Sequence, residues 1–399
     1  MKFKDFWQFV APTRVVAGRG LLEGAGFEFA KEGATRVLVV TDEVVRGTGL
    51  VDRVCDGVRD GGLEVAGVYD GVPPDSDSAV VVACADAARE QGADSILAVG
   101  GGSVMDTAKA ANVVFTHGGE PREWEGFFGL PRGGADGLGR PEELAPLAAI
   151  PTTAGTGSEV SFAAVIKDRE AHLKFTVADF PMYPRLAILD PDATATLPAH
   201  IAASTGMDAM THAIEGYVST EWNPHAGAYS LMALRLIRDN LERAVADTGD
   251  EDARGNMLVA ANLAIMPTSS GAIGIAHSLS HPCGAHYDVP HGVANAINLP
   301  WAIEWNAAGG EEIAGRYRDV NEVLGLEVGG PGEEVGRVLA DHVRATVSRL
   351  GLPTRLSEVG VPEAGIEQLA EDAEGDGCTL VNPRETTAED FRAIYARAL

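Results

Sequence analysis

The chain has 399 residues, which is more than a single hydrophobic core usually organises, so two domains are expected. Hydrophobic residues make up 45% of the sequence and charged residues 22%, a balance that excludes a disordered chain, a collagen and a small disulfide scaffold. The formal net charge of −27 would repel a phosphodiester backbone and an anionic membrane, so the sequence predicts neither nucleic acid nor a membrane as a partner.

The N-terminal half alternates between two patterns. Short apolar runs predict buried strands at residues 36–41, 63–69, 95–99, 147–150 and 186–189. Helical spacing of the apolar residues predicts helices at 44–59 and 78–91. Buried strands that alternate with helices are typical of a doubly wound parallel sheet. Two further runs, at 161–167 and 173–177, predict an inserted hairpin with its turn around Arg169-Glu170-Ala171.

The pattern changes after residue 190. Residues 199–399 show no strand alternation, and helical spacing is clear at 226–241 and 332–350. We therefore predict an α/β N-terminal domain over residues 1–190 and an all-α C-terminal domain over residues 191–399. Residues 255–287 contain no Asp, Glu, Lys or Arg, but prolines and histidines interrupt them, which predicts buried helices rather than a membrane span.

The four cysteines, Cys55, Cys84, Cys283 and Cys378, are far apart and form no CxxC pair. Such thiols are most often small core residues of a protein kept in a reducing compartment. The first seven residues carry charges too early for a signal peptide. These features predict a cytoplasmic protein.

The strand predicted at 95–99 runs through Gly100, Gly101 and Gly102 into a predicted helix. Glycine lets the backbone approach an oxyanion, and a helix N-terminus supplies free N–H groups, so this turn is a candidate phosphate site. Ser103 and Asp106 also fit a capping box, and a well-capped turn that binds no ligand is therefore the alternative. The usual dinucleotide fingerprint is absent, because no third glycine follows at the required spacing.

A second turn, Pro151-Thr152-Thr153-Ala154-Gly155-Thr156-Gly157-Ser158-Glu159, follows the strand predicted at 147–150. Its hydroxyl groups suit ribose or phosphate contacts at the end of a sheet strand, although an ordinary hydroxyl-rich turn has the same composition. The segment Gly18-Arg19-Gly20 is not counted as a phosphate loop, because no strong strand is predicted before it and Glu23 stands where the third glycine should be.

Asp42 ends the strand predicted at 36–41. A carboxylate there is often only a helix cap or part of a turn. In a dinucleotide site it would accept the adenosine ribose hydroxyl and repel a 2′-phosphate, which favours NAD over NADP.

Residues 277–291 hold four of the ten histidines, namely His277, His281, His286 and His291. His277 and His281 are four apart and would share one face of a helix, and Asp208 and His212 repeat that spacing. His291 lies between Pro290 and Gly292, which predicts a turn.

A carboxylate oxygen and three imidazoles drawn from these residues, with no thiolate, predict a site for a first-row divalent metal. Such a cation lowers the pKa of a bound hydroxyl, which suits hydride transfer from an alcohol to a nicotinamide. The alternative is that these histidines are satisfied core residues or helix caps.

These motifs together resemble the iron-containing (group III) alcohol dehydrogenases. The likeness rests on the glycine turn with Asp106 and Lys109, on residues 151–159, on Gly206-Met207-Asp208 with His212 to Glu215, on Pro290-His291-Gly292 and on Asn382-Pro383-Arg384. It covers essentially the whole chain. It implies an N-terminal NAD-binding domain, a helical metal-binding domain, catalysis in the cleft between them, and a homodimer.

The resemblance also implies roles for individual residues. Asp208, His212, His277 and His291 would bind the metal, usually ferrous iron and sometimes zinc. His281 matches a histidine near the nicotinamide, a candidate for a proton relay. The residues implied in cofactor binding are Asp42, Gly101, Gly102, Ser103, Asp106, Thr152, Thr153, Thr156 and Lys174. Many members carry Pro-Asn-Pro where this chain has Pro74-Asp75-Ser76, and a second carboxylate there would weaken or reshape cofactor binding.

The function implied is an NAD(H)-dependent, metal-dependent alcohol dehydrogenase or aldehyde reductase acting on a small primary alcohol and its aldehyde. A polar or anionic aldehyde such as phosphonoacetaldehyde is one substrate considered. Three alternatives on the same fold are a zinc-dependent polyol dehydrogenase, a dehydroquinate-synthase-like lyase and a non-catalytic relative.

Overall fold

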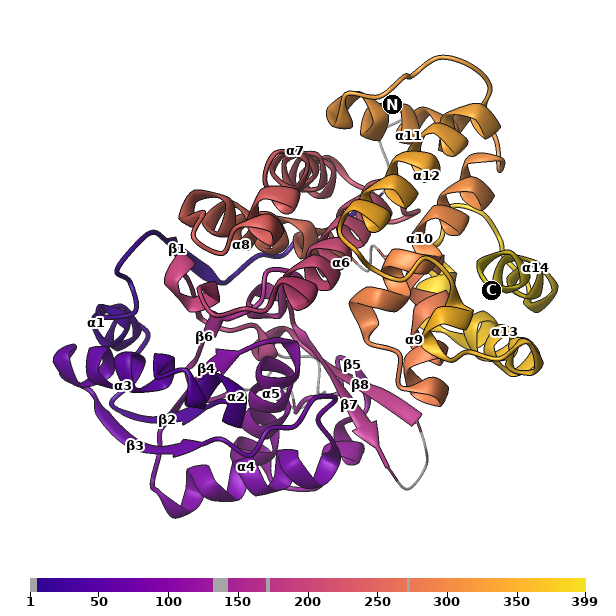
Figure 1. The fold of residues 1–399 in the computed structure, drawn as a ribbon. Coiled ribbons are helices and arrows are strands. Elements are labelled where there is room, and N and C mark those ends of the chain that lie inside the picture. Colours follow the sequence, from indigo (N-terminus) through magenta and orange to yellow (C-terminus); the bar gives the residue numbers. More distant parts are fainter. Residues whose placement is uncertain (1–5, 132–142, 170–172, 271–272) are drawn as a thin grey trace. The chain divides into compact units, whose positions relative to one another are not determined.

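The computed structural model describes residues 6–131, 143–169, 173–270 and 273–399. The chain divides into two compact units. The sheet unit comprises Ala11–Thr153 and Gly157–Leu197, and the helical unit comprises the N-terminal residues up to Val10, Ala154–Thr156 and Pro198–Leu399. Each unit is described by itself below (Figure 1).

The sheet unit is built on six strands. They are β1 (Arg14–Ala17), β2 (Arg36–Val40), β3 (Glu64–Tyr69), β4 (Ser95–Gly100), β6 (Leu147–Pro151) and β9 (Leu186–Leu189). They lie in the order β1-β9-β6-β4-β2-β3, and every neighbouring pair is parallel. The predicted doubly wound parallel sheet is confirmed, and all five predicted strands belong to it.

The main helices of the sheet unit are α1 (Ala25–Ala30), α2 (Glu43–Gly47), α3 (Leu50–Asp60), α4 (Ser78–Glu90) and α5 (Gly102–His117). The prediction of one helix over 44–59 is wrong, because the chain forms α2 and α3 there. Gly49, at the N-cap of α3, has a φ of 81°, a left-handed conformation that breaks the helix and that glycine adopts without steric cost.

Helices cover both faces of the sheet. Successive residues of a strand point to opposite faces, so one strand contributes side chains to two cores. Val37 and Val39 of β2 pack in a core with residues of α1 and α3. Leu38 and Val40 of the same strand pack in a second core with residues of α4 and α5. These strands therefore read as continuous apolar runs, which is the pattern that revealed them in the sequence.

The predicted hairpin is also confirmed. It consists of β7 (Ala163–Asp168) and β8 (Leu173–Ala178), which pair antiparallel, with the two-residue β5 (Gly126–Phe127) beside β8. The expected turn at Arg169-Glu170-Ala171 falls partly outside the described residues.

One of the two reasons given against Gly18-Arg19-Gly20 as a phosphate loop is wrong, because β1 directly precedes the segment. The backbone N–H groups of Leu21 and Leu22, just after this segment, donate to Oδ2 of Asp190 at 2.6 and 3.2 Å. The carboxylate of Asp190 therefore already accepts the hydrogen bonds that these two N–H groups could donate to a phosphate.

The helical unit contains nine longer helices within the residues described. They are α6 (Ala199–Val218), α7 (Pro224–Ala246), α8 (Glu251–Ile265), α9 (Ile275–Tyr287), α10 (His291–Ala307), α11 (Glu311–Leu324), α12 (Gly332–Arg349), α13 (Ile366–Gly375) and α14 (Ala388–Ala398). No strand occurs among its described residues after Pro198. The charge-free segment 255–287 forms most of α8 and α9, whose residues are mainly buried, as predicted.

Candidate functional site

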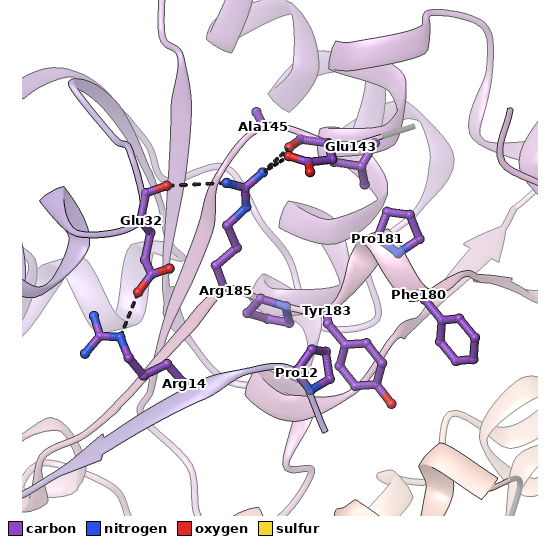
Figure 2. Close-up of a pocket in the computed structure, with 11 residues that line it drawn as sticks. Pro12, Arg14, Glu32, Glu143, Ala145, Phe180, Pro181, Tyr183 and Arg185 are labelled. Carbon is purple, nitrogen blue, oxygen red and sulfur yellow. Dashed lines mark hydrogen bonds and ion pairs between the residues drawn. The ribbon is translucent and has the colours of Figure 1, made fainter. Parts of the chain in front are cut away.

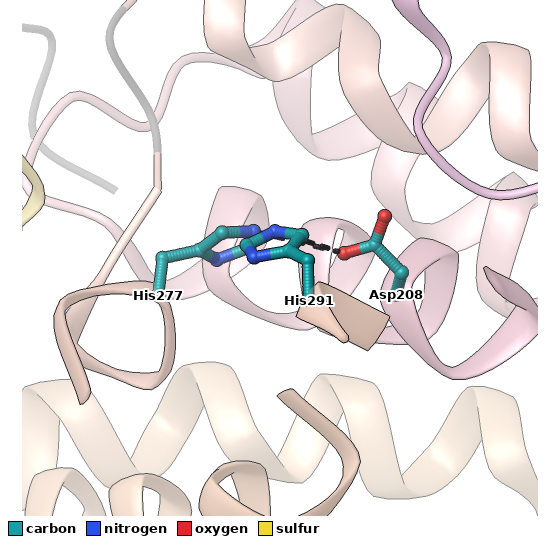
Figure 3. Close-up of side chains that lie close together, drawn as sticks. All are labelled: Asp208, His277 and His291. Carbon is teal, nitrogen blue, oxygen red and sulfur yellow. Dashed lines mark ion pairs between the residues drawn. The ribbon is translucent and has the colours of Figure 1, made fainter. Parts of the chain in front are cut away.

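Three of the four predicted metal ligands converge inside the helical unit. Asp208 projects from α6, His277 from α9 and His291 from α10, and Figure 3 shows the three side chains meeting. Oδ1 of Asp208 lies 3.9 Å from Nε2 of His277 and 3.5 Å from Nε2 of His291. Asp208 and His277 are buried, whereas the His291 side chain is 38% exposed, so solvent reaches the group at His291.

His291 differs from its prediction in one respect. It is the first residue of α10, with Pro290 as the N-cap, and does not lie in a turn. Pro290 ends the preceding segment and the helix begins at once, which fixes the His291 side chain on a regular element.

The fourth predicted ligand, His212, lies at the margin of this group. Its ring stacks on that of His277, with centroids 4.7 Å apart, and its Nδ1 is 4.0 Å from Oδ1 of Asp208. His212 is buried, and its Nδ1 has no hydrogen-bond partner. An unpaired buried nitrogen costs about 1–3 kcal/mol, a cost that a ligated cation would remove.

Asn295 was not predicted, yet it contacts all three converging side chains. Its Nδ2 donates to Oδ1 of Asp208 at 2.8 Å and lies 3.1 Å from Nε2 of His291 and 3.3 Å from Nε2 of His277. Its Oδ1 is buried without a partner. The only sequence signal was its position one helical turn after His291.

This donor set suits a divalent cation. A carboxylate oxygen and imidazole nitrogens without a thiolate are ligands that first-row divalent metals accept. The atoms of Asp208, His277 and His291 that offer ligation lie within 4.8 Å of one another. The unpaired Nδ1 of His212 adds a further buried polar atom that such an ion would satisfy.

Glu215, one turn after Thr211 on α6, holds His277 in place. Its Oε2 lies 2.5 Å from Nδ1 of His277, and its Oε1 accepts the N–H of Ala276 at 2.6 Å. Burial raises the pKa of Glu215 to about 8, against three backbone N–H groups that lower it. Burial also lowers the pKa of His277 well below its ordinary value, which favours the neutral ring; with the proton on Nδ1, toward Glu215, Nε2 would be the nitrogen that ligates.

His281 makes a second histidine–carboxylate contact. Its Nδ1 lies 2.8 Å from Oδ2 of Asp376, and its ring stacks on His291 with centroids 5.4 Å apart. Burial acts to raise the pKa of Asp376, but His281 and the N–H of Cys378 outweigh it and hold the pKa below the ordinary value. Asp376 is therefore ionised and orients the ring through Nδ1. Nε2 is the ring nitrogen of His281 that does not contact Asp376.

The glycine turn lies between β4 and α5, as predicted. Gly101 is the N-cap of α5, and no side chain caps the helix. The capping-box prediction is therefore wrong, because Ser103 lies within the first turn. Its Oγ instead accepts the N–H of Asp75 at 3.2 Å. The first N–H groups of α5 thus have no side-chain cap, which leaves the turn suited to an anion.

Asp106 and Lys109 connect α5 to the hydroxyl-rich turn. Asp106 accepts hydrogen bonds from Oγ of Ser158 at 2.7 Å and from the N–H of Val165 at 3.0 Å. Nζ of the buried Lys109 donates to Ser158 and to Ser161 at 2.7 and 2.8 Å. Burial lowers the pKa of Lys109 to about 8. Asp106 thus fixes the turn in this structure, and its role toward a cofactor stays a prediction.

The predicted threonines fall in different units. Thr152 and Thr153 belong to the sheet unit and Thr156 to the helical unit. Thr153 packs against the glycine turn, because a Cβ on Gly101 would lie 3.3 Å from it. Gly155 lies directly on α6, where a Cβ would meet Thr205 at 2.5 Å, so only glycine allows this approach.

Two further predicted residues lie in the sheet unit, one after a strand and one within a strand. Asp42 follows β2 and caps α2, accepting the N–H of Val45 at 2.8 Å, which is the capping role considered from the sequence. Lys174 lies on β8, and its Nζ pairs with Oδ1 of Asp75 at 2.8 Å.

A pocket of about 370 Å³ in the sheet unit contains none of the predicted site residues (Figure 2). Its two arginines point at carboxylates: Arg14 pairs with Glu32 at 2.7 Å and Arg185 with Glu143 at 3.1 Å. With their charges already neutralised, these arginines give the pocket no clear ligand chemistry. Among the residues described, no helix has the length and apolar character needed to cross a membrane.

Comparison with known proteins identifies the family. The family model "Iron-containing alcohol dehydrogenase" matches residues 12–191, and "Fe-containing alcohol dehydrogenase family, C-terminal" matches residues 202–399. The chain is 35% identical over 395 residues to the NAD-dependent methanol dehydrogenase of Bacillus methanolicus, covering 98% of this chain and 99% of that protein.

Solved structures agree. The structure of a 1,3-propanediol oxidoreductase matches with a TM-score of 0.92 and 32% identity, covering 99% of this chain and all of that one. The sulfoacetaldehyde reductase of Bifidobacterium kashiwanohense, in complex with NAD+, matches with a TM-score of 0.86 and 27% identity over 99% of both chains. The resemblance in the sequence is thereby confirmed, and the chain belongs to the iron-containing alcohol dehydrogenases, a family of oxidoreductases.

Proposed function

We propose that the chain is an NAD(H)-dependent and divalent-metal-dependent dehydrogenase that interconverts a small primary alcohol and its aldehyde. The observation that carries this proposal is the convergence of Asp208, His277 and His291 from three helices, with the unpaired nitrogen of His212 beside them. We assign these four side chains as the metal ligands.

A divalent cation in this site would supply a Lewis acid that lowers the pKa of the substrate hydroxyl. The side chains around it have separate tasks. Glu215 keeps Nδ1 of His277 engaged, so that Nε2 faces the site. Asp376 does the same for His281, whose other nitrogen would carry the proton exchanged with the substrate.

The cofactor half of the proposal rests on the sheet unit. The uncapped N-terminus of α5 with Gly101, Gly102 and Ser103 would hold the diphosphate of NAD(H). Asp42 would accept the adenosine ribose hydroxyl. We accordingly assign residues 1–190 as the NAD-binding domain and residues 191–399 as the metal-binding domain.

The donor set of the metal site accepts ferrous iron or zinc, and the family to which the chain belongs favours iron. The four cysteines are unpaired, which supports a cytoplasmic location. A homodimer remains our expectation for the assembly.

The proposal is tested with the purified protein. We expect about one divalent metal ion per chain by elemental analysis, and oxidation of NADH when small aldehydes are supplied. Loss of that activity on chelation and its return with ferrous iron or zinc would complete the result. Protein that binds no metal and oxidises no NADH with any aldehyde would favour the non-catalytic relative.

Replacing Asp42 is expected to change the choice of cofactor. In Asp42→Gly the repulsion of a 2′-phosphate disappears, so the ratio of kcat/KM for NADPH to that for NADH should rise about tenfold or more. Glycine is tolerated at an N-cap at a cost of a few tenths of a kcal/mol, so α2 should persist. Asp42→Asn keeps a capping oxygen and should show a similar gain with NADPH; an unchanged ratio in both variants would argue against this role.

A further inference from the structure

The segment around Asp75 is fixed beside the glycine turn of the sheet unit. The N–H of Asp75 donates to Oγ of Ser103, in the first turn of α5, at 3.2 Å. The carbonyl oxygen of Ser76 accepts the N–H of Lys167 of β7 at 2.9 Å. Asp75 is therefore held in position by its neighbours on both sides and is not a freely moving surface acid.

The carboxylate of Asp75 holds the ammonium group of Lys174. Oδ1 of Asp75 lies 2.8 Å from Nζ of Lys174, which projects from β8. Asp75 has a φ of 53°, in the left-handed region that only glycine, asparagine and aspartate adopt routinely. Both the backbone shape and the ion pair therefore depend on the residue type at this position.

This arrangement places a negative charge at a site suited to anions. The N-terminus of α5 offers N–H groups and the positive end of the helix dipole. Lys174 would add a full positive charge, but Asp75 already neutralises it. A diphosphate bound at this turn would lie close to the carboxylate of Asp75, and it could pair with Lys174 only by drawing that ammonium group away from Asp75.

The geometry points to Asp75 as an internal competitor of the diphosphate of NAD(H), which weakens cofactor binding by occupying Lys174. This inference rests on the proposed function, because it takes the glycine turn as the cofactor site. Asp75 would thus help to set both the affinity for the cofactor and the rate at which the cofactor dissociates.

The test is a double-mutant cycle on the metal-loaded protein, with the Kd of NADH measured by fluorescence titration. Asp75→Asn keeps the left-handed backbone and the N–H donor but removes the charge, so NADH should bind about three- to tenfold more tightly. In the Lys174→Met background the same change should alter the Kd less than about twofold. The gain should also shrink in about 1 M salt, where charges are screened within roughly 3 Å.

Asp56→Asn is the matched control for net charge. Asp56 is exposed and pairs with Arg59 inside α3, so its removal should leave the Kd unchanged. The inference is overturned by an Asp75→Asn protein that binds NADH no more tightly than the wild type. An equal gain in the Lys174→Met background, or in Asp56→Asn, also overturns it. A wild-type protein that binds no NADH would instead contradict the proposed function.

Discussion

His277→Ala is expected to lose the metal and the enzymatic activity together. His277 is buried at the centre of the group, with Nε2 3.9 Å from Oδ1 of Asp208 and its ring stacked on His212. Removing it takes away one of the four proposed ligands and leaves Oε2 of Glu215 without its partner. Metal content after dialysis should fall to background, and NADH oxidation should fall with it.

His281→Ala should behave differently, because His281 pairs with Asp376 and is not one of the assigned ligands. We expect it to retain the metal while kcat falls by about 10²- to 10⁴-fold, the usual contribution of a positioned acid or base. His286→Ala is the control on the same helix, since His286 pairs with Asp372 at 2.6 Å with its side chain 37% exposed, and it should change neither quantity. Equal metal content in the His277 and His281 variants would show that ligand and relay are wrongly assigned.

Glu215→Gln is expected to weaken metal binding by about 10- to 100-fold, the usual effect of removing the partner that orients a metal-binding histidine. The two oxygens of Glu215 contact the N–H of Ala276 and Nδ1 of His277, and both groups are donors when His277 ligates through Nε2. A glutamine must turn its NH₂ group toward one of these donors, so one of the two contacts is lost. If the Nδ1 contact is lost, His277 is free to take the tautomer that cannot ligate through Nε2.

Metal affinity of Glu215→Gln is best measured by competition with a chelator, because this readout does not depend on turnover. Tyr217→Phe serves as the control. Tyr217 lies two residues after Glu215 on α6, and its hydroxyl donates to Asp319 of α11, a hydrogen bond that the variant lacks. That variant should lower the melting temperature without changing metal affinity. A Glu215→Gln protein with the wild-type affinity would show that Glu215 has no part in holding His277.

The parts of the fold predicted from the sequence are those whose signal is local. Strand β2 was found because both of its faces are buried, which makes it a continuous apolar run. Strand β1 was missed because it has only four residues and every second one faces solvent. The split between α2 and α3 was missed because apolar spacing continues across Gly49.

In the candidate site, too, the residues predicted from the sequence are those with a local signal. The histidines and Asp208 were found because they recur at helical spacing in a charge-poor region. The capping box failed because Gly101 and not Ser103 is the N-cap, and Asp106 instead accepts from Ser158 and Val165, which lie 52 and 59 residues away. Glu215, Asn295 and Asp376 were given no role, since each matters only through contacts between separate helices or turns.

The most direct measurement is anomalous X-ray scattering from crystals of the metal-loaded protein, recorded at the iron and zinc absorption edges. We predict one peak at roughly 2.0–2.2 Å from atoms of Asp208, His212, His277 and His291, the usual distance for nitrogen and oxygen ligands. A second cluster, of His281, Asp376 and Cys378, also has the residue types to bind a metal. A peak only at that cluster, or no peak at Asp208, would contradict the assignment of the metal centre.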